Sequence, residues 1–64
     1  MESRDVSDLS SVASTLNDMT VRIEAIARVY EDTPREDLAA RLREVERALG
    51  SAVRRLEALL RAER

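Results

Sequence analysis

The sequence predicts an all-α fold, a single-domain antiparallel two-helix hairpin, and three observations lead to this prediction. The composition is 44% hydrophobic and 38% charged, with one glycine and one proline, which is typical of long helices and coiled coils. Apolar residues recur at alternating spacings of three and four in two stretches, as on one face of a helix. The two stretches mirror each other about Pro34, so a chain folded back there brings equivalent positions side by side. The stripes are Leu9, Val12, Leu16, Met19, Ile23, Ile26 and Tyr30, and Leu38, Leu42, Val45, Leu49, Ala52, Leu56 and Leu59.

The first helix is predicted over residues 5–31. Asp5 and Asp8 place acids in its first turn, where they suit the positive end of the helix dipole. Its first half is rich in serine and threonine, which compete with the helix for backbone hydrogen bonds. We therefore expect packing, and not intrinsic propensity, to hold this helix together.

The turn is predicted at residues 32–34. Thr33, Pro34 and Glu36 form the sequence of a capping box, with threonine as the N-cap, proline at the first helical position and glutamate at the third. A connection this short forces the two helices to lie antiparallel.

The second helix is predicted over residues 34–63. Gly50 interrupts it at a cost of about 1 kcal/mol relative to alanine. The apolar spacing passes through Gly50 unbroken, which favours a continuous helix. The alternative is a helix that ends at Gly50 and a new one that begins after Ser51.

Both stripes are wider than the contact between two helices requires. With Leu9 as position a of a heptad, apolar or small residues also occupy position e, which follows position d. A face three positions wide is typical of a helix with two neighbours. We therefore expect positions a and d to join the hairpin, and position e to join two hairpins in a homodimeric four-helix bundle. The e positions include Val6, Ala13, Thr20 and Ala27, and Ala39, Val53 and Leu60; the residues expected to support self-association are Leu16, Ile23, Leu49, Val53, Leu56 and Leu60.

The composition points away from catalysis. The chain has no cysteine and no histidine, which removes the usual zinc ligands and the commonest general base at neutral pH. We expect no catalytic residue, no metal site and no cofactor, and a non-enzymatic module for protein–protein interaction or oligomerisation, acting as a small regulatory adaptor. No apolar run approaches the ~20 residues of a membrane span, and the first residues lack the order of a signal peptide, so we expect a cytoplasmic protein without membrane contact.

Charge is divided between the two halves of the chain. Residues 1–32 hold seven acids and three arginines, whereas residues 33–64 hold six acids and eight arginines. On the second helix, Arg47, Arg54 and Arg61 share the outermost heptad position, with Arg43 beside them. This pattern suggests a second hypothesis, a regulator that binds nucleic acid or nucleotides through an arginine stripe. A solvated outer face with ordinary pairs such as Asp37–Arg41 and Glu57–Arg61 is the other interpretation, which the net charge of −2 and the single aromatic residue favour.

A second apolar line lies off the main stripe of the first helix. Val21, Ala25 and Val29 are spaced four apart. They suggest a docking strip for another helical protein. Scattered surface apolar residues are the competing interpretation.

Overall fold

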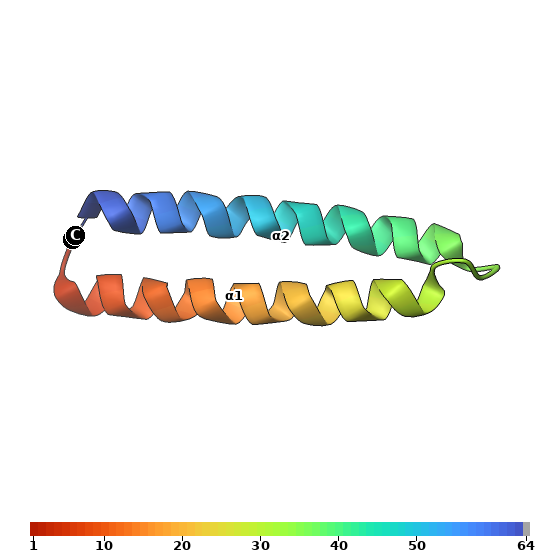
Figure 1. The fold of residues 1–64 in the computed structure, drawn as a ribbon. Coiled ribbons are helices and arrows are strands. Elements are labelled where there is room, and N and C mark those ends of the chain that lie inside the picture. The colour runs from red at the N-terminus through yellow and green to blue at the C-terminus, as the bar shows by residue number, and fades with distance from the viewer. Residues whose placement is uncertain (64) are drawn as a thin grey trace.

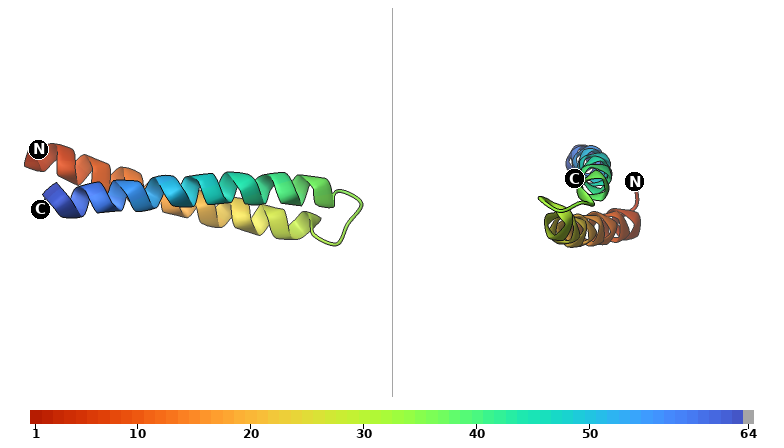
Figure 2. Two further views of the ribbon diagram at one scale, coloured as in Figure 1. Left: turned by 90° about the horizontal axis from the view of Figure 1, so that it is seen from above. Right: turned by 90° about the vertical axis from the view of Figure 1, so that its right-hand side faces the viewer.

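The protein is a helical hairpin. A computed structural model describes residues 1–63, which form helices α1 (Ser3–Tyr30) and α2 (Glu36–Glu63). The helices lie antiparallel and side by side, with the connecting turn at one end of the molecule (Figure 1). At the other end the N-terminal amine contacts Glu63 Oε1 at 3.0 Å. The molecule extends 49 Å along its long axis and 14 by 10 Å across it, and Figure 2 shows that the helices cross at a shallow angle. The predicted all-helical hairpin is confirmed.

Helix α1 begins at Ser3, two residues before the predicted start, and ends at Tyr30. Glu2 occupies the N-cap position without a capping side-chain hydrogen bond. Asp5 in the first turn and Arg28 in the last turn both suit the helix dipole. The hydroxyl of Thr20 donates to the carbonyl oxygen of Leu16 at 2.8 Å, so this threonine is accommodated within the helix.

Thr33 connects the two helix ends. Its Oγ1 donates to the carbonyl oxygen of Tyr30 at 2.5 Å and accepts from the backbone N–H of Arg35 at 3.1 Å. Asp32 has a φ of 57°, in the left-handed region that aspartate tolerates better than most residues. Regular α-helix begins at Glu36, two residues after Pro34. The predicted capping box is therefore not formed as expected: the Thr33 side chain accepts from Arg35, and the N–H of Glu36 donates to the backbone carbonyl oxygen of Thr33 at 3.1 Å.

Helix α2 runs without interruption through Gly50 and Ser51, so the alternative of two shorter helices is excluded. Gly50 does not have a positive φ. A Cβ atom at this position would have Arg54 Nη1, at 3.4 Å, as its nearest neighbour outside the local helix backbone. Neither backbone conformation nor space therefore requires a glycine here.

The residues buried between the helices differ from those that the sequence suggested. They are all at position e, whereas positions a and d were expected to form the contact. Three of the five are alanines, and small side chains let two helices approach closely, so the larger residues at position d are displaced to the side. We call these five residues the hairpin seam: Ala13, Ala27, Ala39, Val53 and Leu60.

This arrangement corrects one expectation. Val53 and Leu60 were predicted to lie on an outer flank between subunits. They are instead 8% and 3% exposed inside a single hairpin. The flank available to a partner must therefore lie elsewhere.

Candidate interaction surfaces

The largest apolar surface of the hairpin is built from position d of both helices. Its five large side chains are each 44% to 50% exposed. Residues at position a, including Leu16, Ile23, Leu49 and Leu56, lie between this surface and the seam and are half-buried. We call the exposed set the apolar face: Val12, Met19 and Ile26 of α1, and Val45 and Leu59 of α2.

The two halves of the apolar face lie on the same side of the hairpin. In an antiparallel pair of helices, equal heptad positions fall on the same side of the contact. The ion pairs demonstrate this for position b, because Arg43 of α2 contacts Glu24 and Glu31 of α1. Position d is two residues from position b and so roughly 160° around each helix. The apolar face therefore lies opposite these ion pairs, and we call the side with the ion pairs the polar face.

Arg43 is the centre of the polar face. Its Nη1 lies 3.1 Å from Glu46 Oε2 and 3.5 Å from Glu24 Oε1, and its Nε donates to Glu31 Oε1 at 3.1 Å. Arg28 adds a second contact to Glu24 at 2.5 Å. The hydrogen bond to Glu31, followed by the bonds to Glu46 and Glu24, raises the pKa of Arg43. The hydrogen bond from Arg28, with a further contribution from Arg43, lowers the pKa of Glu24. This cluster ties α1 to α2 near the turn.

The predicted arginine stripe is divided by this arrangement. Arg43 has its guanidinium engaged by three carboxylates of the hairpin. Arg47, Arg54 and Arg61 are exposed and make no ion pair within residues 1–63. The stripe therefore consists of one structural arginine and a row of three that remain available.

The two ordinary ion pairs suggested by helical spacing are not formed in the described part of the chain. Asp37 pairs with Arg35 at 3.3 Å and not with Arg41. The hydrogen bond from Arg35 lowers the pKa of Asp37. Glu57 and Arg61 line the same groove without coming within ion-pair distance of each other.

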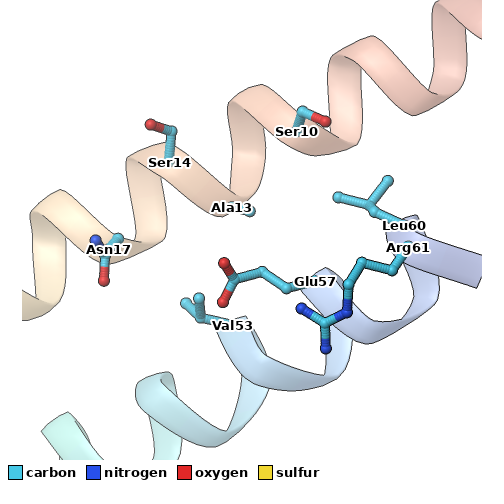
Figure 3. A pocket seen from close by; sticks show the side chains of 8 residues that line it. All are labelled: Ser10, Ala13, Ser14, Asn17, Val53, Glu57, Leu60 and Arg61. Carbon is cyan, nitrogen blue, oxygen red and sulfur yellow. The ribbon is translucent and has the colours of Figure 1, made fainter. Parts of the chain in front are cut away.

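A groove of about 530 Å³ crosses the polar face between the start of α1 and the end of α2 (Figure 3). Seam residues form its floor and polar side chains its walls. This groove was not expected from the sequence; the available signal was the small polar side chains at position b of α1, which leave space beside the seam. Its lining residues are Ser10, Ala13, Ser14, Asn17, Val53, Glu57, Leu60 and Arg61.

The line Val21, Ala25 and Val29 is exposed on the side of α1 that faces away from α2. Val21 and Val29 are the most exposed large apolar residues of the described chain, at 63% and 68%. Their spacing keeps them outside the hairpin seam. The structure therefore leaves the line accessible to solvent but not continuous with the apolar stripe of α2.

No family model, curated protein or solved structure matches this chain. Within residues 1–63, neither helix has the length and apolarity needed to cross a membrane. The same residues contain no group of acidic side chains arranged to hold a metal ion.

Proposed function

We propose that this hairpin is a non-enzymatic protein–protein interaction module that self-associates through its apolar face into a homodimeric four-helix bundle. The single observation that carries the proposal is the apolar face itself. It extends along both helices and lies opposite the side on which Arg43 of α2 is paired with Glu24 and Glu31 of α1. A regulatory adaptor acting through such a module is the role we infer.

The small hairpin seam makes a partner energetically important. Three of its five buried residues are alanines, and no large side chain within residues 1–63 is fully buried. Burying the exposed half of each large residue of the apolar face contributes about 1 kcal/mol per side chain. The sum, several kcal/mol per hairpin, is comparable with the net stability of a small domain.

The pairing of residues on the apolar face and the charges at its rim support a second copy as the partner. A copy turned end for end sets Val12 against Met19 of the partner subunit and Val45 against Leu59 of the partner subunit. The first pair is centred between Thr15 and Leu16 of α1, and the second is centred on Ala52 of α2. At the rim of α1, the same arrangement brings Asp8 towards Arg22 of the partner subunit, a pair of opposite charges.

The residues that border the apolar face on α2 are also compatible with a copy turned end for end. Position g, which borders the apolar face, alternates between a large cation and a small side chain. A copy turned end for end sets each arginine against an alanine, so no like charges are directly opposed. The four positions are Arg41, Ala48, Arg55 and Ala62.

The test is the solution mass of the protein by sedimentation equilibrium over a range of concentrations. We expect a species of twice the 7.2 kDa chain mass. Val12→Gln and Val45→Gln, made singly, should each weaken the dimer at least tenfold, because a two-fold interface contains every substitution twice.

The matched control is Val21→Gln, the same exchange at an exposed valine outside the apolar face. It should leave the dissociation constant unchanged. A folded wild-type monomer at every concentration, or equal effects of the three variants, would contradict self-association. In the first case the apolar face becomes the candidate site for another helical protein.

A further inference from the structure

We propose that the arginine row of α2, formed by Arg47, Arg54 and Arg61, binds the sugar-phosphate backbone of a nucleic acid. The three residues are seven apart, so they project from the same side of α2. At 1.5 Å per residue the row extends about 21 Å. Guanidinium groups spaced about 10.5 Å apart can contact phosphates at intervals along an extended polyanion, and each can donate two parallel hydrogen bonds.

The donors of the row are available. Arg28, Arg35 and Arg43 are each held by a carboxylate of the hairpin. In contrast, no residue of the row makes an ion pair within residues 1–63. Binding a phosphate therefore requires no internal ion pair to break.

The surroundings of the row favour close approach of a polyanion. Gly50, Ser51 and Ala58 lie between the arginines and present little bulk. Between Arg47 and Arg61 the single acid is Glu57, which lines the groove, and Arg55 adds a further exposed cation. The negative net charge of the chain thus belongs to other parts of the molecule, and the end of α2 is locally basic.

The groove extends the donor set at one end of the row. Figure 3 shows Arg61 at one end of the groove, with Ser14 and Asn17 of α1 towards its other end, where Val53 lies. Hydroxyl and amide groups are common phosphate ligands beside arginine. A strand following the row would meet these donors before it reaches Arg61.

Self-association leaves the row accessible. Arg47, Arg54 and Arg61 occupy position f, two residues from position d and so about 160° around α2 from the apolar face. The proposal therefore does not depend on dimer formation, and a dimer would carry two rows.

The chemistry of the row favours nucleic acid over a membrane surface. Peripheral membrane helices insert large apolar side chains beside their cations. The residues between the arginines on this side of α2 are small or, at Glu57, charged, and the large apolar residues of α2 lie on the apolar face or near the seam. A phosphate backbone needs only the cations and the close approach.

The experiment measures binding by fluorescence anisotropy, with short labelled duplex DNA and single-stranded RNA as probes at low salt. Arg47→Ala/Arg54→Ala should weaken binding at least tenfold and lower the slope of log K against log salt by about two for duplex DNA. The control Arg4→Ala/Arg41→Ala removes the same charge from exposed arginines that also make no ion pair within residues 1–63. It should change affinity by less than threefold, which separates the row from net charge.

Three results would overturn the proposal: no binding of either probe, equal losses in the two double variants, or binding to phosphatidylserine vesicles without binding to nucleic acid. Sedimentation equilibrium on the same samples keeps the two proposals distinguishable. A wild-type monomer that binds nucleic acid through the row would refute self-association and support this inference. A dimer that binds neither probe would do the reverse.

Discussion

The two broad faces of the hairpin satisfy their side chains in opposite ways. On the polar face, Arg43 of α2 holds Glu24 and Glu31 of α1, so opposite charges meet within one chain. On the apolar face, large side chains such as Met19 and Val45 remain about half exposed, with no further helix to cover them. The cluster around Arg43 is therefore paired within the hairpin, whereas the large apolar side chains of the opposite face are only partly covered. Such a division suits an interaction module. Burial of the apolar face would favour association, and the ion pairs of the polar face stabilise the hairpin itself.

The hairpin seam separates the two faces, and Leu60→Ala tests it with the largest expected effect. Leu60 is the most buried large residue, so truncation should lower the free energy of unfolding by about 2–5 kcal/mol. Urea denaturation measures this change. Leu59→Ala, at the neighbouring residue on the apolar face, should destabilise the hairpin less and weaken self-association more. Equal effects of the two substitutions would mean that the seam is assigned to the wrong side of α2.

Gly50→Ala tests the continuity of α2 on the polar face. Because Gly50 lies within a regular helix and its missing Cβ has space, alanine should raise the free energy of unfolding by about 1 kcal/mol. The measurement is again urea denaturation, with circular dichroism to follow helicity. A loss of stability would show that α2 bends or breaks at this glycine in solution.

Arg43→Gln tests the charge cluster of the polar face. Losing the contacts to Glu24, Glu31 and Glu46 should lower the thermal midpoint, by less than Leu60→Ala does, since exposed ion pairs contribute little individually. The difference from wild type should shrink at high salt because ions screen exposed charges. Arg47→Gln is the matched control, and its midpoint should stay near that of the wild type. Identical midpoints for the two variants would indicate that the cluster does not stabilise the hairpin.

The smallest expected effect is that of acid on the ion pairs of the polar face, which should stabilise the hairpin less as the pH falls. Arg28 and Arg43 lower the pKa of Glu24 in the folded hairpin below its ordinary value of 4.5. The stabilisation is therefore present above pH 4.5 and is lost as the pH falls towards the lower pKa of the folded state. Thermal midpoints recorded as the pH falls through this window should drop less for Glu24→Gln than for the wild type. Parallel curves would exclude Glu24 as a contributor.

Local sequence patterns were sufficient to predict the secondary structure. The spacing of the apolar stripes predicted both helices, and the Thr33–Pro34 sequence predicted where the chain turns. Each helix boundary lies within two residues of its predicted place, because capping and proline act over one turn of backbone. Among the predicted site residues, Val21 and Val29 are exposed as expected, because they lie outside the apolar stripe of the first helix.

The partners of individual side chains were less predictable. Arg43 belongs by spacing to the same surface as Arg47, yet it turns towards carboxylates of the other helix. A long flexible side chain reaches several acids, and only the arrangement of both helices decides which one it meets. The groove at Arg61 depends in the same way on residues from both helices.

By itself, the sequence determined that the chain forms two helices, that they fold back around Pro34 and that each carries an apolar stripe wider than one contact. Only the tertiary structure decided which part of each stripe faces the other helix. Heptad spacing marks the stripe but does not rank its positions. The closest approach of two helices depends on the volumes of side chains that meet across the contact. Ala13, Ala27 and Ala39 permit that approach, and they leave the larger residues at position d exposed as a surface for a partner.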